Sequence, residues 1–358
     1  MAGKTGHLEG ADRMESDSIA SSRGQKRLVG GLLIVLSVLA IPVAVFVPFS
    51  SWLGPLEANS AMATTPAPID GKRAFRYLEQ ICEIGPRIAG SEANARQRKM
   101  VADHFKAMGA TLREQPFSTQ HPLTGERVNM VNLIGSWHPE HTQRVVVAAH
   151  YDTRPHPDEE TDPDRLKLPF LGANDCASGV ALLMEIAHHL NDMNTPWGVD
   201  LVIFDGEELV YGHHPDTQGE YFLGSKEFAR IYVEDVEARR SRSRYAAGLV
   251  LDMVGGSKLQ ISQEPNSLNL AFSLVRDVWA VARQLDAKGF KFRVGREVLD
   301  DHLALNNAGI PTIDLIDFDY PYWHKADDLP KNCSADSLAE VGRVVTAWLA
   351  QPKRRTRR

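Results

Sequence analysis

Two adjacent glutamates, Glu207 and Glu208, follow an apolar run in the segment DLVIFDGEEL, residues 200–209. Carboxylates this close raise each other's pKa, because each negative charge disfavours the other. A solvated turn is the ordinary explanation for such a pair, since charged side chains are mostly exposed. The alternative is a functional site in which one glutamate binds a cation while the other carries a proton. The remaining polar residues of the chain decide between these interpretations.

Further candidate ligands lie at the ends of other apolar runs. They are His150 and Asp152 after RVVVAA, Asp175 in LGANDCASG, Asp252 in LVLDMVGG and His324 in DYPYWHKADD. Each has an ordinary alternative: a satisfied core histidine for His150, a helix N-cap for Asp175, an ion pair for Asp252 and a surface loop for His324. Together they form a nitrogen- and oxygen-rich set at strand ends, which suits zinc.

Helical and strand patterns alternate from about residue 70 onward. Apolar runs predict strands at 131–137, 144–150, 200–204, 248–254 and 311–316. Helical spacing of apolar residues predicts helices at 71–85, 92–108, 177–190, 268–285 and 336–349. This alternation predicts an α/β fold with a central, mostly parallel or mixed, twisted sheet flanked by helices on both faces. Ligands of such sheets bind beyond the carboxyl ends of the strands, where the candidate residues lie.

The N-terminal part differs from the rest of the chain. Residues 28–49 carry no charge, which predicts a transmembrane helix, and Arg23, Lys26 and Arg27 precede it. The positive-inside rule then places the polar tail 1–27 in the cytoplasm and the main domain on the extracytoplasmic side, periplasmic or extracellular. A buried core helix and a cleaved signal peptide, with small residues at 58–63, are the alternatives. Residues 50–70 are interpreted as a linker, 71–352 as the catalytic domain and 353–358 as a basic tail.

Charge and cysteine content exclude several classes of protein. The net charge of −6 over 358 residues indicates no nucleic-acid partner. The three cysteines, Cys82, Cys176 and Cys333, form no C-x-x-C motif, which rules out a cysteine zinc site and leaves at most one disulfide. The acidic segment HPDEETDPD at 156–164 is interpreted as a solvated loop, with a calcium site or a lid as the alternatives.

An ordered series of motifs resembles the zinc aminopeptidase superfamily over about residues 72–350. The series is H-x-D at 150–152, N-D-x-x-S-G at 174–179, F-D-G-E-E at 204–208, L-D-M-V-G at 251–255, D-D-H at 300–302 and W-H-x-x-D-D at 323–328. Within the superfamily, the chain is most similar to the glutaminyl-peptide cyclotransferases of the animal type and their bacterial relatives. The D-D-H motif, where aminopeptidases more often have S-D-H, and the tryptophan before His324 carry this similarity.

The resemblance implies a role for each motif. Asp175, Glu208 and His324 would bind one catalytic zinc and leave a fourth position open. Glu207 would be the general acid and base, hydrogen-bonded to Asp252. The remaining implied residues are Asp301, a partner in the same network, and Trp323, a wall of the substrate pocket whose alternative is core packing. The substrate would be a peptide or protein with an N-terminal glutamine, and the product pyroglutamate.

Two other functions remain open from the sequence. A zinc aminopeptidase would use the same residues with two metal ions, the second held by His150 and Asp252. A receptor ectodomain that kept the fold and lost the chemistry is the non-enzymatic alternative. The complete ligand set argues against the receptor, because the site and not the fold licenses a function.

Overall fold

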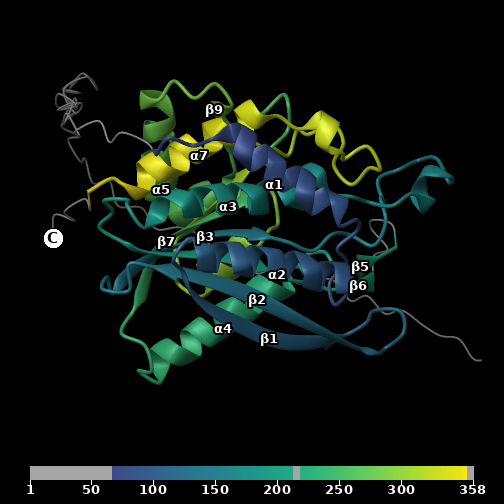
Figure 1. Cartoon of the computed structure of the whole chain (residues 1–358), viewed down its shortest axis with the longest axis horizontal. Helices are drawn as coiled ribbons and strands as arrows, with labels where there is room; N and C mark the ends of the chain where they lie inside the picture. Colours follow the sequence, from purple (N-terminus) through teal and green to yellow (C-terminus); the bar gives the residue numbers. More distant parts are fainter. Residues whose placement is uncertain (1–66, 213–217, 353–358) are drawn as a thin grey trace, which may run out of the picture. The chain divides into compact units, whose positions relative to one another are not determined.

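The computed structural model describes residues 67–212 and 218–352 (Figure 1). The predicted membrane span, 28–49, lies outside these residues, as do the cytoplasmic tail and the basic tail. Among the described residues, no helix combines the length and the apolar character needed to cross a bilayer. Membrane anchoring therefore stays a prediction.

A six-stranded mixed sheet forms the centre of the fold, in the order β1-β2-β4-β3-β7-β10. Its strands are β1 (Thr111–Gln120), β2 (Arg127–Trp137), β3 (Gln143–His150), β4 (Gly198–Phe204), β7 (Arg244–Asp252) and β10 (Thr312–Ile316). β4, β3, β7 and β10 run parallel to one another, whereas β1 and β2 form an antiparallel pair and β2 is antiparallel to its neighbour β4. The predicted mixed α/β sheet is confirmed.

The apolar run that predicted a strand at 144–150 is uninterrupted because side chains on both faces of the central strand β3 are buried. Val145 and Val147 belong to the large core on one face of the sheet, whereas Val146 and Ala148 belong to a smaller core on the other face. Both faces of β3 are therefore buried, and a strand buried on both faces carries apolar residues without alternation.

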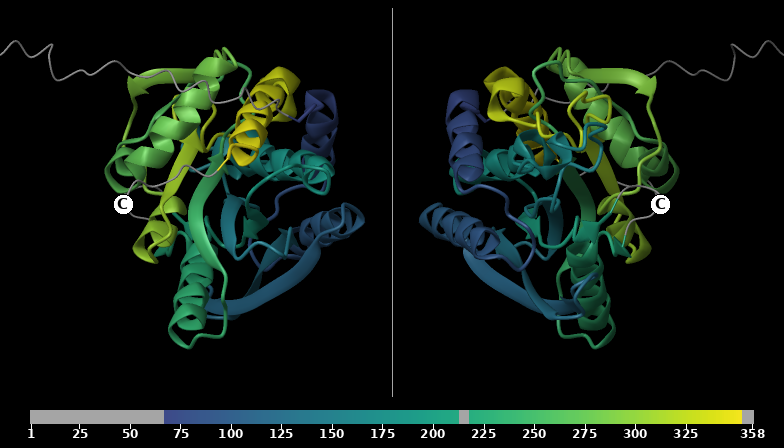
Figure 2. Two further views of the ribbon diagram at one scale, coloured as in Figure 1. Left: turned by 90° about the vertical axis from the view of Figure 1, so that its left-hand side faces the viewer. Right: turned by 90° about the vertical axis from the view of Figure 1, so that its right-hand side faces the viewer.

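Helices cover both faces, as predicted. The first face carries α1 (Gly71–Glu83), α2 (Glu92–Ala107), α3 (Gly179–Leu190), α5 (Pro265–Gln284) and α7 (Ala335–Leu349), and α1 packs beside α7 (Figure 2). The second face carries α4 (Leu223–Glu237) and α6 (His302–Asn307). Figure 1 shows α4 below β2, on the side of the sheet opposite to α1 and α3.

Several elements and boundaries differ from the sequence prediction. The edge strand β1, the helices α4 and α6, and the short strands β5 (Val210–Tyr211), β6 (Gln218–Gly219), β8 (Ile261–Gln263) and β9 (Phe290–Val294) were not predicted. The helix expected at 177–190 begins at Gly179, because residues 173–178 form a separate turn that contains Asp175. The three cysteines are buried and free, so the one disulfide that the sequence allowed does not form.

Candidate active site

The carboxyl ends of three neighbouring parallel strands bring the candidate residues to one edge of the sheet. β3 ends at His150, β7 ends at Asp252, and β4 ends at Phe204, which pairs with His150. Beyond β4 the chain turns sharply at Gly206, whose φ of +71° favours glycine. A Cβ atom at Gly206 would also lie 2.5 Å from the sulfur of Met130. This turn places Glu207 and Glu208, which follow it, at the same edge of the sheet as His150 and Asp252.

Asp175, Glu208 and His324 converge as predicted, although 149 residues separate the first from the last (324 − 175 = 149). Their ligand atoms lie within 4.8 Å of one another, and all three residues are buried. Nε2 of His324 is 3.1 Å from Oε1 of Glu208 and 3.6 Å from Oδ2 of Asp175. One imidazole and two carboxylates fit the donor set of a zinc ion that keeps an open coordination position. We call these three residues the ligand triad.

Arg154 and Asp158 hold the ligand triad in place. Arg154 donates from Nη1 to Oε1 of Glu208 at 2.9 Å and from Nη2 to Oδ2 of Asp158 at 2.6 Å. Oδ1 of Asp158 lies 3.2 Å from Nδ1 of His324, so a carboxylate orients the ring nitrogen that faces away from the metal position. Such carboxylate–histidine contacts are common around zinc. Asp158 is therefore buried and part of the site, so the interpretation of 156–164 as a solvated loop fails for Asp158 and agrees with the exposed residues 161–164.

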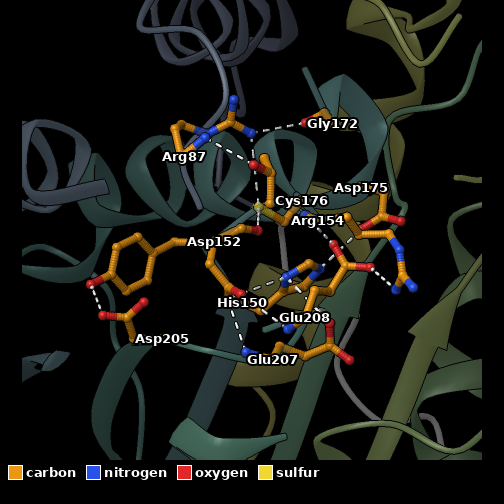
Figure 3. Close-up of polar contacts among 12 residues, drawn as sticks. Arg87, His150, Asp152, Arg154, Gly172, Asp175, Cys176, Asp205, Glu207 and Glu208 are labelled. Atoms are coloured by element: carbon orange, nitrogen blue, oxygen red, sulfur yellow. Dashed lines mark hydrogen bonds and ion pairs between the residues drawn. The ribbon is translucent and has the colours of Figure 1, made fainter. Parts of the chain in front are cut away.

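A second carboxylate contact fixes the turn that presents Asp175. The backbone N–H groups of Asn174 and Asp175 donate to the carboxylate of Asp328 at 2.9 and 3.0 Å. The hydroxyl of Tyr320 donates to the same carboxylate at 2.8 Å. Buried Arg87, in the GPRIAGS segment, donates to the carbonyl groups that precede this turn, including that of Gly172 (Figure 3).

The two adjacent glutamates differ sharply in pKa. Burial acts to raise the pKa of Glu208, but Arg154 and His324 stabilise its charged form and lower the pKa to about 2. Burial raises the pKa of Glu207 well above its ordinary value, and the charge of Glu208 adds to this effect against the opposing influence of His150. A pair of carboxylates whose pKa values are pushed apart is the pattern expected of a ligand beside a proton carrier.

Asp152 fixes the backbone of both glutamates. Its carboxylate accepts the backbone N–H groups of Glu207 and Glu208, each at 3.0 Å. Figure 3 shows Glu207 and Glu208 beside the ring of His150, whose Nδ1 lies 3.7 Å from Oε2 of Glu207. The sequence marked Asp152 as a candidate, and the structure makes it a support for the turn.

His150 and Asp252 form a second potential metal position with Asp175. Nε2 of His150 lies 3.2 Å from Oδ1 of Asp175 and 3.4 Å from Oδ1 of Asp252. Burial raises the pKa of Asp252 to about 7, opposed by its contact with His150. Asp252 contacts His150, and the hydrogen bond between Asp252 and Glu207 stays a prediction. The site therefore offers the donors for one ion or for two.

A cavity of about 280 Å³ opens onto Glu207 and the ligand triad. Its apolar wall consists of Phe222, Val298, Leu299, Ile316, Phe318 and Trp323. The Trp323 ring stacks on His324 with centroids 3.9 Å apart, so the predicted place of Trp323 in the pocket wall agrees with the structure. Asp300 also lines the cavity, whereas Asp301 is fully buried at the start of α6. The charges of Asp301 and Asp300 raise the pKa of Glu207 further.

Comparisons with known proteins agree with this site. The model of Peptidase family M28 matches residues 132–349. A crystal structure of Fimbriiglobus ruber glutaminyl cyclase is 39% identical, with a TM-score of 0.77 over 80% of this chain and 96% of that chain. The structure of a leucine aminopeptidase precursor from Bacteroides thetaiotaomicron is 30% identical, with a TM-score of 0.72 over 80% of this chain and 98% of that chain. The glutaminyl-peptide cyclotransferase-like protein of Mus musculus is 24% identical over 96% of each chain. The similarity to glutaminyl cyclases inferred from the motifs is confirmed.

Proposed function

Because the chain belongs to Peptidase family M28, we propose that it is a zinc-dependent glutaminyl-peptide cyclotransferase, which converts the N-terminal glutamine of peptides to pyroglutamate and releases ammonia. The observation that carries the proposal is the convergence of Asp175, Glu208 and His324 beside Glu207 in the lining of one cavity. The similarity to solved glutaminyl cyclases supports this reaction over others of the family.

The cavity would take the glutamine side chain of the substrate. Asp175, Glu208 and His324 would hold the zinc ion, which would supply a Lewis acid for the side-chain amide carbonyl. The apolar wall, with Phe318 and Trp323, would contact the methylene groups and exclude water that could otherwise hydrolyse the amide. Since the attacking α-amine and the amide belong to one residue, the reaction is intramolecular and gains from proximity.

Glu207 would move the proton. The α-amine nitrogen forms a bond to the amide carbon, and the bond from that carbon to the amide nitrogen breaks. Glu207 accepts the proton that the amine loses and gives it to the departing nitrogen, so ammonia leaves with no net change in protons. A carboxylate with a raised pKa suits both steps, because a catalyst transfers protons best when its pKa lies near the working pH.

An aminopeptidase is the second candidate, and the donor group of His150, Asp175 and Asp252 is the observation that favours it. Two ions would then activate a water molecule, with Glu207 as the base. The similarity to a leucine aminopeptidase precursor supports this alternative.

Two substrates distinguish the candidates. The purified chain is incubated with a peptide that begins with glutamine and, separately, with a leucine anilide. Formation of pyroglutamate without release of leucine supports the cyclotransferase. Release of leucine without pyroglutamate overturns it in favour of the aminopeptidase.

We further propose that residues 28–49 anchor the enzyme in a membrane and that the catalytic domain acts on peptide or protein N-termini outside the cytoplasm. The uncharged segment and the basic residues that precede it support this placement. If the proposal holds, the full chain stays with the membrane fraction after a high-salt or carbonate wash. Release into the soluble fraction would contradict it.

A further inference from the structure

A hollow of about 490 Å³ lies between α5 and β9, outside the candidate active site. Aromatic side chains form its apolar part, namely Phe272 and Trp279 of α5 and Phe292 of β9. Arg276 and Arg283, also on α5, line it as well, and no acidic side chain of the described residues does. None of these five residues lines the catalytic cavity. We call them the basic aromatic surface.

Large apolar side chains are exposed around this surface. Among the described residues, seven large apolar side chains are exposed, and four of them lie on α5 and β9. They are Leu270, Phe272, Phe292 and Val294, of which Phe272 is 60% and Phe292 is 48% exposed. Contact of apolar groups with water is unfavourable, so a group of exposed apolar side chains commonly marks a surface that another molecule covers.

The same region is basic, although the chain as a whole is acidic. Residues 265–296, from the start of α5 to just past β9, contain six basic and two acidic side chains, whereas the net charge of the chain is −6. Arg283 lies over the Phe292 ring, with its guanidinium carbon 4.4 Å from the ring centre. Arg276 pairs with the adjacent Asp277 at 3.4 Å. Arginines beside aromatic rings combine apolar contacts with a charged end, which suits the boundary between lipid and water.

The membrane anchor proposed above would keep this surface close to a bilayer. The proposed span ends at residue 49, and α1 begins at Gly71. The 21 residues between them extend over at most about 75 Å, so the folded domain stays within reach of the lipid headgroups. A tether of this kind gives even a weak contact between the domain and the bilayer a high effective concentration.

We propose that the basic aromatic surface docks on a bilayer that contains anionic phospholipid. The arginines attract the negatively charged headgroups, and Phe272 and Phe292 enter the boundary between headgroups and acyl chains. A symmetric dimer through the same surface is disfavoured, because each copy would bring the same arginines to the interface. The proposal rests on the membrane location proposed for the enzyme and does not depend on which reaction it performs.

A fluorescent label on the surface tests the proposal. The three native cysteines are buried, so the full chain with Phe272→Cys can be labelled selectively with an apolar, environment-sensitive dye. It is reconstituted into vesicles of phosphatidylcholine, with or without phosphatidylglycerol. We expect stronger and blue-shifted emission only in the vesicles with phosphatidylglycerol, and its reversal at high salt. Leu123→Cys is the matched control, because Leu123 is 56% exposed between β1 and β2, and its label should report no change.

Removal of charge gives a second readout from the labelled Phe272→Cys chain. Arg276→Gln together with Arg283→Gln should lower the ratio of docked to free domain on the order of tenfold, because each basic residue near an anionic leaflet adds to the attraction. Arg230→Gln together with Arg240→Gln is the matched control. This pair removes the same charge from the exposed region of α4, on the other face of the sheet, and should leave the ratio unchanged.

The outcomes separate docking from anchoring. Equal emission in neutral and anionic vesicles, or equal effects of the two pairs of arginine variants, would overturn the proposal. Emission that rises with the density of protein in the vesicles, and not with lipid charge, would show that a second copy covers the surface and would also overturn it. If the full chain does not stay in the membrane, the same vesicles are added to the soluble chain, so docking is measured even when the proposed anchor fails.

Discussion

Arg154 and Glu208 form a buried ion pair in which Nη1 of the arginine lies 2.9 Å from Oε1 of the glutamate. This contact separates the properties of the two neighbouring glutamates, because it stabilises the charge of Glu208 and leaves Glu207 without an arginine partner among the described residues. Glu208 is thereby held as an anion ready to bind a cation. The ion pair of Arg154 with Glu208 therefore explains how two adjacent carboxylates can have different roles, one as a charged ligand and the other as a proton carrier.

Substitution of Arg154 should weaken zinc binding. Arg154→Gln removes the charge that orients Glu208 and Asp158, and the loss of such supporting contacts lowers metal affinity about 10- to 100-fold. Competition with a chromophoric chelator measures this affinity. Arg165→Gln is the control, because Arg165 pairs with Glu160 and Asp327 instead. Equal affinities for the two variants would exclude the supporting role of Arg154.

Removal of the histidine ligand should abolish stable zinc binding. His324→Ala leaves two carboxylates and no nitrogen donor in the ligand triad. Zinc at this position should therefore be lost on dialysis, as measured by metal analysis. His121→Ala serves as the control, because His121 bonds to Tyr211 and lies outside the ligand triad. Retention of the wild-type zinc content by His324→Ala would argue against His324 as a ligand.

Loss of the Trp323 ring should lower kcat/KM for a glutamine peptide. Trp323→Ala removes the stacking on His324 and part of the apolar wall. Aromatic stacking contributes about 0.5 to 1.5 kcal/mol, so kcat/KM for a glutamine peptide should fall roughly twofold to tenfold from this contact alone. Trp323→Phe should restore much of the loss. Unchanged kcat/KM for Trp323→Ala would indicate that this residue only packs the core.

A partly buried ion pair far from the site predicts how the free energy of unfolding depends on pH. Arg73 donates to both carboxylate oxygens of Glu185, at 2.6 and 2.8 Å, and so links α1 to α3. Burial acts to raise the pKa of Glu185, but contacts with His189 and Arg73 lower it to about 2. A lowered pKa of an acid contributes stability above the unfolded value of 4.5, and this stability is lost as the pH falls from there through about 2.

Glu185→Gln tests this dependence by chemical denaturation. At pH 7 the variant should lose about 2 to 3 kcal/mol of the free energy of unfolding, and the difference should shrink as the pH falls below 4.5. Glu79→Gln, on the exposed side of α1, is the control and should change stability by less than about 0.5 kcal/mol. A difference that stays constant from pH 7 to the acid range would contradict the lowered pKa of Glu185.

The ligand triad could be predicted from the sequence, whereas its supports could not. Asp175, Glu208 and His324 belong to recognisable motifs near the ends of buried strands, and parallel strands bring such ends together. Arg154 and Asp158 lie in a segment without apolar periodicity, so only the folded loop places them beside Glu208 and His324. The interpretation of the acidic loop as solvated was wrong for Asp158, because composition does not reveal which of its carboxylates turns inward.

The spacing of residues in the sequence also left two features open, namely the positions of Asp300 and Asp301 and the edge strand β1. The sequence favoured Asp301 as a partner of Glu207, and this role stays a prediction: the charges of both Asp301 and Asp300 raise the pKa of Glu207, whereas Asp300 alone of the two lines the cavity. The edge strand β1 was missed because charged residues and Pro116 interrupt it, and proline is typical of edges rather than of central strands.

The pair of variants Glu207→Gln and Glu208→Gln tests the central claim most directly, with zinc content and pyroglutamate formation measured on the same preparations. We predict that Glu207→Gln keeps the zinc content of the wild type while its turnover falls at least about 100-fold, and that Glu208→Gln loses the zinc. Loss of zinc from Glu207→Gln with retention by Glu208→Gln would show that the roles of the two carboxylates are reversed.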